Sequence, residues 1–109
     1  MNTVMVTNLD STFVPIPDAL GAELAVSNSV VTVNPLDVVR WLGKRVKRVE
    51  LSVKGHPVHY TLDNTDPASA GVGSYLAVGL HVWSLDKVRA AKFIRAGGDN
   101  ATIRFEPGT

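Results

Sequence analysis

Apolar residues occupy every second position in two stretches near the middle of the chain, from 49 to 53 and from 58 to 62. In the first stretch the apolar positions are Val49, Leu51 and Val53, and charged or hydroxyl residues stand between them. Successive side chains of a strand point to opposite faces, so each stretch predicts a half-buried β-strand. The four-residue link between them, which contains glycine and proline, predicts that the two strands form an antiparallel hairpin.

A third alternating stretch covers residues 75–85, with Gly79 in its middle. One predicted face carries Leu76, Val78, Leu80 and Val82. The glycine predicts a bulge or a close backbone approach at that point. Further along, residues 92–95 and 101–105 flank a Gly-Gly-Asp-Asn segment that tolerates positive φ, and this arrangement predicts a terminal hairpin.

Two short helices are expected between the strands. Asn34 is a suitable cap, Pro35 fits the first helical position, and Gly43 is suited to end the helix. The second helix is a single turn after Asp86, capped by Ser84 or by Asp86 itself. A loop carrying Trp41 into the core is the competing interpretation of the first segment.

The strand count fixes the predicted fold class. Residues 23–27 and the valine-rich residues 29–33 add two strands or one bent strand, and residues 3–7 could form another. Six to eight short strands predict an all-β fold, an antiparallel β-sandwich or jelly roll with one or two single-turn helices. We expect this domain to span 23–109 and to follow an extended N-terminal arm, residues 1–22. The arm contains prolines, so it is predicted to follow a sheet edge, the domain surface or a neighbouring subunit.

Composition narrows the possible functions. The chain has 109 residues, of which 45% are apolar, enough for the core of one domain. Eleven Lys and Arg against ten Asp and Glu argue against a nucleic-acid partner, and the absence of cysteine excludes disulfides and thiolate metal sites. No run reaches the roughly 20 apolar residues that span a membrane, and the first residues lack the features of a signal peptide. We therefore expect no membrane partner and a protein that begins in the cytosol of its producer.

Two sets of side chains could bind a metal ion, but simpler roles fit them as well. The carboxylates of Asp63, Asp66 and Asp99 could bind Ca²⁺. The imidazoles of His56, His59 and His81 could meet across strands and bind Zn²⁺. The Asp-Asn-Thr-Asp-Pro turn lacks the glycine and the distal glutamate of a helix-loop-helix calcium site, and capping of the turn by its own side chains is favoured. The histidines lack a carboxylate at fixed spacing. We expect no metal and no cofactor.

Catalysis is not expected either, because no Gly-x-Ser-x-Gly or other nucleophile turn is present. The basic run at 44–48 is interrupted by valine and favours a solvated strand edge. Trp83 and Tyr75 could form an aromatic platform for a sugar, whereas burial in the core or in an interface would use a tryptophan equally well.

Three segments together carry a family resemblance: the turn Tyr60–Pro67, with the sequence YTLDNTDP, the segment Gly73–Leu76, and Ala90–Arg95, with the sequence AAKFIR. They resemble a group of small tailed-bacteriophage virion proteins, in which a Tyr-Thr-x-Asp-Gly-x-Asp-Pro turn precedes a Gly-x-x-Leu segment and a late Ala-x-Lys-Phe-Ile-Arg strand. The likeness covers residues 44–105. Asn64 stands where glycine is usual, and asparagine tolerates the left-handed conformation. The turn alone also resembles the small β-sandwich appended to chitobiase-type glycosidases.

The resemblance implies a non-enzymatic structural protein of the virion, assembled in the cytoplasm of the bacterial host. The expected role is a capsid decoration or cement protein that binds the head surface as a homo-oligomer; a head-fibre base and a neck or tail component are alternatives. Its partners would be the major capsid protein or other virion proteins. The predicted contacts are the arm residues Val14, Ile16 and Leu20 and exposed apolar residues near Trp41 and Trp83. A carbohydrate-binding module is the alternative from another class, and burial of Trp83 would count against it.

Overall fold

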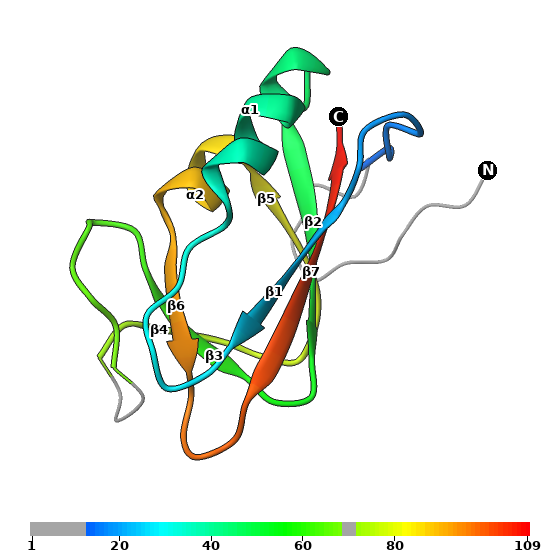
Figure 1. The fold of residues 1–109 in the computed structure, drawn as a ribbon. Helices are drawn as coiled ribbons and strands as arrows, with labels where there is room; N and C mark the ends of the chain where they lie inside the picture. The colour runs from blue at the N-terminus through cyan, green and yellow to red at the C-terminus, as the bar shows by residue number, and fades with distance from the viewer. Residues whose placement is uncertain (1–12, 69–71) are drawn as a thin grey trace.

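The computed structural model describes residues 13–68 and 72–109. Within them the chain forms seven strands and two helices, which divide into two antiparallel sheets (Figure 1). The elements are β1 (Ala22–Val26), α1 (Pro35–Gly43), β2 (Arg48–Lys54), β3 (Val58–Thr61), β4 (Ser74–Leu76), β5 (Gly79–Ser84), α2 (Leu85–Ala90), β6 (Lys92–Arg95) and β7 (Ala101–Gly108). The strand orders are β1-β7-β2-β5 and β4-β3-β6. The predicted all-β class with antiparallel sheets is confirmed at this level.

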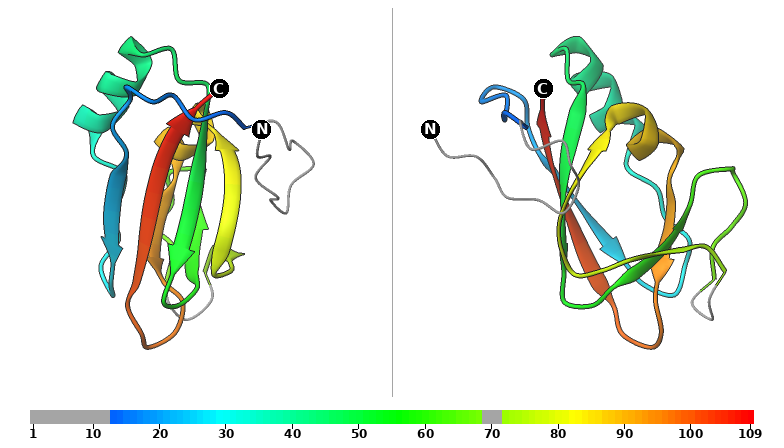
Figure 2. Two further views of the ribbon diagram at one scale, coloured as in Figure 1. Left: turned by 90° about the vertical axis from the view of Figure 1, so that its right-hand side faces the viewer. Right: turned by 180° about the vertical axis from the view of Figure 1, so that it is seen from behind.

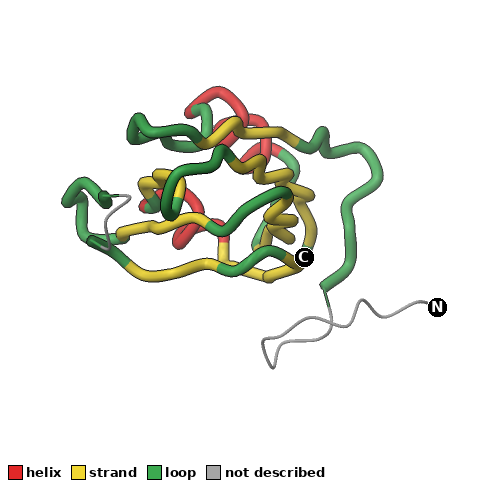
Figure 3. Tube along the Cα trace, turned by 90° about the horizontal axis from the view of Figure 1, so that it is seen from below, coloured by secondary structure: helices red, strands yellow, loops and turns green. Residues whose placement is uncertain are grey.

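Aromatic side chains from both sheets meet in one core. The ring centroids of Phe93 on β6 and Phe105 on β7 are 6.3 Å apart, and those of Phe93 and Trp83 on β5 are 6.0 Å apart. Trp41 of α1 adds a fourth ring, 6.3 Å from Phe105. Both helices lie at the same end of the molecule (Figure 1), and Figure 3 shows the strands from the opposite end.

The alternation in the first stretch is confirmed by β2. Val49, Leu51 and Val53 are fully buried, while Arg48, Glu50 and Ser52 are partly exposed on the other face. The neighbours β7 and β5 lie on either side of β2 (Figure 2, left).

Both predicted hairpins are wrong. β2 does not pair with β3, because β5 and β7 already occupy its two edges. Gly55, at φ 86°, turns the chain out of one sheet and into the other, and Gly97, at φ 89°, does the same between β6 and β7. β3 pairs with β4 and β6 instead, so each of these links joins two sheets rather than two neighbouring strands.

The third alternating stretch is split into β4 and β5 rather than continuous. Leu76 is buried in the three-stranded sheet, and Val78 lies in an exposed break between the strands. Gly79 follows at φ 132°, a conformation that favours glycine, and the chain then enters the other sheet. Beyond the break, Trp83 contacts the core rings, although strict alternation from Leu76 would place it on the opposite face. The alternation of buried and exposed side chains is therefore not continuous across the break between β4 and β5.

The helix boundaries agree well with the capping residues. The Asn34 side chain accepts a hydrogen bond of 2.9 Å from the Leu36 N–H, and α1 ends at Gly43. With nine residues α1 is longer than the single turn predicted. For α2 the cap is Ser84, whose hydroxyl accepts from the Lys87 N–H at 3.2 Å.

The described part of the arm lies along an edge of its own domain. Val14 N–H donates to the Thr109 carbonyl at 3.2 Å, and Ile16 N–H donates to the Pro107 carbonyl at 3.1 Å. Phe13 is buried there. The predicted edge path is thus confirmed for this segment, whereas the predicted strand at 3–7 lies outside the described residues. Residues 29–33 form no further named strand, and only Val31 makes a bridge, to Phe93.

Candidate functional site

The end of the molecule that carries the helices exposes a row of apolar side chains. Leu36, Val39 and Leu42 are 72%, 64% and 50% exposed, and Leu20 of the arm is 67% exposed. Residues three positions apart are neighbours on a helix surface, so the three side chains of α1 form a continuous ridge. We call these three residues the α1 ridge.

A hollow lies on each side of α1. The first, of about 250 Å³, lies between the arm residues Asp18, Ala19 and Leu20 and the helix residues Arg40 and Trp41. The Lys44 ammonium lies 3.2 Å from the Asp18 carboxylate at its rim. We call it the arm hollow.

The second hollow, of about 290 Å³, lies between α1 and α2. Val38, Val39 and Leu42 line it from α1, Val33 from the preceding segment and Arg89 from α2. We call it the helix groove. Apolar side chains dominate the helix groove, and Ala19, Leu20 and Trp41 give the arm hollow an apolar wall, so either could accept an apolar group of a partner protein.

Both tryptophans belong to the core. Trp41 is fully buried, and its indole N–H donates to the Leu20 carbonyl at 2.7 Å. Trp83 is 6% exposed, and its ring lies 4.8 Å from the Tyr60 ring, with the Lys87 ammonium 4.2 Å from its centroid. Neither ring is open to a partner or to a sugar, and the burial of Trp83 counts against the aromatic platform.

The structure brings Leu20 next to Trp41, as the hydrogen bond between them shows. Val14 and Leu20 are exposed, while Ile16 packs partly against the core. The sequence prediction missed the α1 ridge itself, although the spacing of Leu36, Val39 and Leu42 in the predicted helix was a usable signal.

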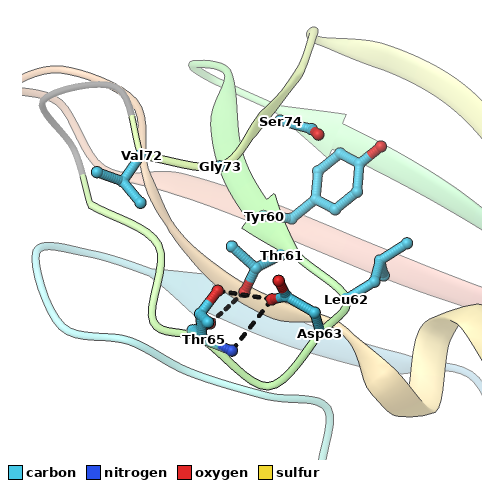
Figure 4. A pocket seen from close by; sticks show the side chains of 8 residues that line it. All are labelled: Tyr60, Thr61, Leu62, Asp63, Thr65, Val72, Gly73 and Ser74. Atoms are coloured by element: carbon cyan, nitrogen blue, oxygen red, sulfur yellow. Dashed lines mark hydrogen bonds between the residues drawn. The ribbon is translucent and has the colours of Figure 1, made fainter.

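The aspartate-rich turn after β3 is held by its own side chains (Figure 4). The Asp63 carboxylate accepts from the Thr65 N–H at 3.2 Å and from the Thr65 hydroxyl at 2.6 Å, and the Thr61 hydroxyl donates to the Thr65 carbonyl. The hydrogen bonds from Thr65 lower the pKa of Asp63 below its ordinary value. Asn64 adopts φ 71°, as expected where the resemblance has glycine. The predicted self-capping of the turn is confirmed at Asp63.

Lys92 on β6 fastens the turn to the outer face of its sheet. Its ammonium donates to the Asn64 carbonyl at 3.1 Å and to the Asp66 carboxylate at 3.0 Å. His59 on β3 lies 3.0 Å from the Ala68 carbonyl through Nδ1. The first and third segments of the resemblance therefore contact each other directly. The turn and the late strand form one structural unit, because Lys92 of the strand anchors the turn.

Beside the turn lies an open hollow of about 420 Å³ (Figure 4), lined by Tyr60, Thr61, Leu62, Asp63, Thr65, Val72, Gly73 and Ser74. Most of its hydroxyl and carboxylate groups are on the Asp63–Thr65 side. The hydrogen bonds within the turn occupy the two threonine hydroxyls and one oxygen of Asp63.

The residues of the two metal hypotheses are not brought together. Asp63 bonds to Thr65 and Asp66 to Lys92, while Asp99 lies 3.9 Å from His56. Within 13–68 and 72–109, no group of three or more His, Cys, Asp or Glu side chains could hold a metal ion.

A pair of like charges lies on the outer face of the four-stranded sheet. Glu50 on β2 is directly opposite Glu106 on β7. One Glu50 carboxylate oxygen is buried and has no hydrogen-bond partner among the described residues. Burial, and secondarily the charge of Glu106, raises the pKa of Glu50 above 4.5.

No family model, no curated protein and no solved structure matches this chain. Neither of the helices in the described part is long and apolar enough to cross a membrane.

Proposed function

We propose that this chain is a non-enzymatic structural protein of a bacteriophage virion, a capsid decoration protein that binds the head surface as a homo-oligomer. We also infer that its two sheets form a β-sandwich, since ring contacts join them across one core. The virion assignment comes from the resemblance of the turn, the Gly-x-x-Leu segment and the late strand. Support for that resemblance is the contact between Lys92 and the turn, which makes two of the three segments one structural unit.

The observation that carries the binding proposal is the exposed Leu20 beside the arm hollow. The arm is fixed there by backbone bonds to β7 and by the hydrogen bond from Trp41 to the Leu20 carbonyl, so its apolar side chain is held facing outward at little further entropic cost. An apolar side chain of the shell protein that enters the hollow would bury Leu20 and the hollow wall together. Such burial contributes roughly 25 cal/mol per Å² of apolar surface.

Substitution of Leu20 by aspartate tests this surface directly. Particles of the phage that encodes the chain are prepared with wild-type protein, with Leu20→Asp and with Val78→Asp, and the copies retained are counted by mass spectrometry. Val78 is a matched control because it is a similarly exposed apolar residue, 53% against 67%, in the break between β4 and β5. We expect loss of retention for Leu20→Asp alone. Equal retention of the two variants would remove the arm from the binding surface.

The absolute copy number tests the position in the virion. Copies in proportion to the shell protein support a head decoration role, whereas a single small ring of copies per particle indicates the neck or the tail. Absence from purified particles would contradict the proposed function altogether.

A carbohydrate-binding module is the second candidate, and one observation favours it. The Tyr75 ring on β4 is 63% exposed and lies 6.0 Å from the His59 ring, so it offers a flat face to solvent. An exposed aromatic face of this kind can stack on a sugar ring. Binding on a glycan array that Tyr75→Ala abolishes and Val72→Ala preserves would favour this candidate over shell binding.

A further inference from the structure

We propose that the α1 ridge is the contact between two copies of this chain, packed about a two-fold axis so that each ridge lies in the helix groove of the other copy. This deepens the proposed function, whose homo-oligomer it describes. The evidence for it is independent of the virion, because it lies in the shape and charge of one surface.

The ridge has the right chemistry for a contact between proteins. Leu36, Val39 and Leu42 are each half exposed or more, and α1 buries its other apolar side, Val38 and Trp41, in the core. The helix is therefore apolar on two sides. Only one of them is used within the described part of this chain, and the other remains open to solvent.

The helix groove lies immediately beside the ridge and shares two residues with it, Val39 and Leu42. A raised apolar row and an apolar groove that run side by side on one surface are self-complementary. A two-fold rotation brings each row opposite the other copy's groove, which is the arrangement that a closed dimer requires. A different partner protein would need only one of the two features.

The charges at the two borders fit the same arrangement. At the α2 wall of the groove, Arg89 lies 3.7 Å from Asp86. Beyond the ridge, Arg40 forms an ion pair with Asp37 on α1. The two-fold rotation brings the border of one copy next to the opposite border of the other. Each border carries one positive and one negative side chain, so Arg40 can face the other copy's Asp86 without like-charge repulsion.

The size of the surface sets the expected strength. A nine-residue helix is about 14 Å long, and its exposed side is small beside the roughly 800 Å² per partner of a standard stable interface. We therefore expect a weak dimer that forms at high protein concentration, as on a shell where copies are held close together.

Sedimentation equilibrium of the free protein, between about 10 µM and about 1 mM, measures the association by mass action. For the wild type we expect an equilibrium between monomer and dimer. For Val39→Asp we expect the dissociation constant of the dimer to be at least about tenfold larger. Val78→Asp should associate like the wild type. A monomer at all concentrations, or equal association of the two variants, would overturn the proposal, as would growth into open filaments.

A cysteine scan tests the axis, since the natural chain contains no cysteine. Val39 is the middle residue of the ridge and lies nearest the proposed two-fold axis. Under mild oxidation Val39→Cys should form a disulfide-linked dimer, and Val78→Cys should remain a monomer. Equal cross-linking at the two positions would show random collision rather than a defined contact.

Charge exchange tests the borders. Arg40→Asp should weaken association, because it leaves two negative groups facing Asp86 of the other copy. Adding Asp86→Arg should restore it. Circular dichroism of each variant checks that the fold is kept, and failure of the restored pair to associate would contradict the assigned orientation. All three measurements use protein outside the particle, so their failure is distinguishable from failure of the virion assignment.

Discussion

Glu50 is a carboxylate whose position works against folding at neutral pH. It lies opposite Glu106 on the neighbouring strand, and like charges directly opposite in a sheet are destabilising. Its raised pKa means that the folded chain binds a proton more tightly than the unfolded chain does. The favourable contribution of protonated Glu50 is complete below the unfolded pKa of 4.5, and it is lost as the pH rises through the folded value.

Glu50→Gln should therefore stabilise the protein at pH 7, because the amide carries no charge and can donate to Glu106. We expect a gain of about 0.5 kcal/mol after screening by solvent, or roughly 3 °C in Tm. The gain should disappear below about pH 4.5, where the wild-type carboxyl is protonated too. Thermal unfolding followed by circular dichroism between these pH values measures the difference. A gain that persists unchanged in acid would show that charge is not its cause.

Asn64 is the residue at which the turn departs from the resembling sequences, and its backbone explains why the departure is tolerated. At φ 71° it occupies the left-handed region, which glycine and asparagine adopt far more readily than other residues.

Asn64→Gly should leave the free energy of unfolding nearly unchanged, while Asn64→Val should lower it by about 1–2 kcal/mol because a β-branched residue is strained there. Urea denaturation of the two variants gives the comparison. Equal stability of both would mean that the turn can relax to a negative φ.

At the scale of elements, the turn after β3 depends on a residue of a different strand. Lys92 joins the Asn64 carbonyl and the Asp66 carboxylate, while bonds within the turn supply the remaining order. The turn is exposed, so the anchor affects its local order more than the global stability.

Lys92→Met should keep the aliphatic packing and remove both contacts. We expect Tm to change by no more than a few degrees, and we expect faster proteolysis and faster amide exchange within residues 62–67. Lys54→Met is the matched control, since Lys54 is an exposed strand lysine with no ion pair to a described residue. Faster cleavage in both variants would point to general destabilisation instead of loss of the anchor.

At the scale of the whole molecule, the arm and β7 are joined by backbone hydrogen bonds and by side-chain packing. Phe13 packs against Gly108, and the Thr109 N–H donates to the Val14 carbonyl at 2.9 Å. A Cβ added to Gly108 would lie 2.5 Å from the Phe13 ring and 2.5 Å from the Val14 carbonyl oxygen, so the arm must move to admit it.

Gly108→Ala should lower stability by about 1–3 kcal/mol, as overpacking of a tight contact does. The Ile16 amide, which bonds to Pro107, should exchange faster in hydrogen-exchange measurements. Gly98→Ala is the control, because nothing lies within 4 Å of its added Cβ. An unchanged Ile16 amide in Gly108→Ala would show that the arm docks without this contact.

Local chemistry was enough to predict several elements. The alternation in β2, the asparagine and serine caps of the helices and the self-capped turn at Asp63 all depend on residues close in sequence, and each lies where it was expected. The same holds for the arm's edge path, since a segment punctuated by proline cannot supply a continuous row of N–H donors.

Only the tertiary structure decided which strands pair and which apolar residues face outward. The sequence of a strand does not determine which strand pairs with it. β2 pairs with β5 and β7, which lie far along the chain, and not with β3, which follows it directly. Packing of the core also decided which apolar side chains are buried. Both tryptophans, which the sequence analysis predicted at an interface, lie in the core, whereas Leu36, Val39 and Leu42 are exposed. Alternation and capping are set by the geometry of a few bonds, whereas pairing and burial depend on contacts between distant segments, and those contacts determine the surface that this protein presents to a partner.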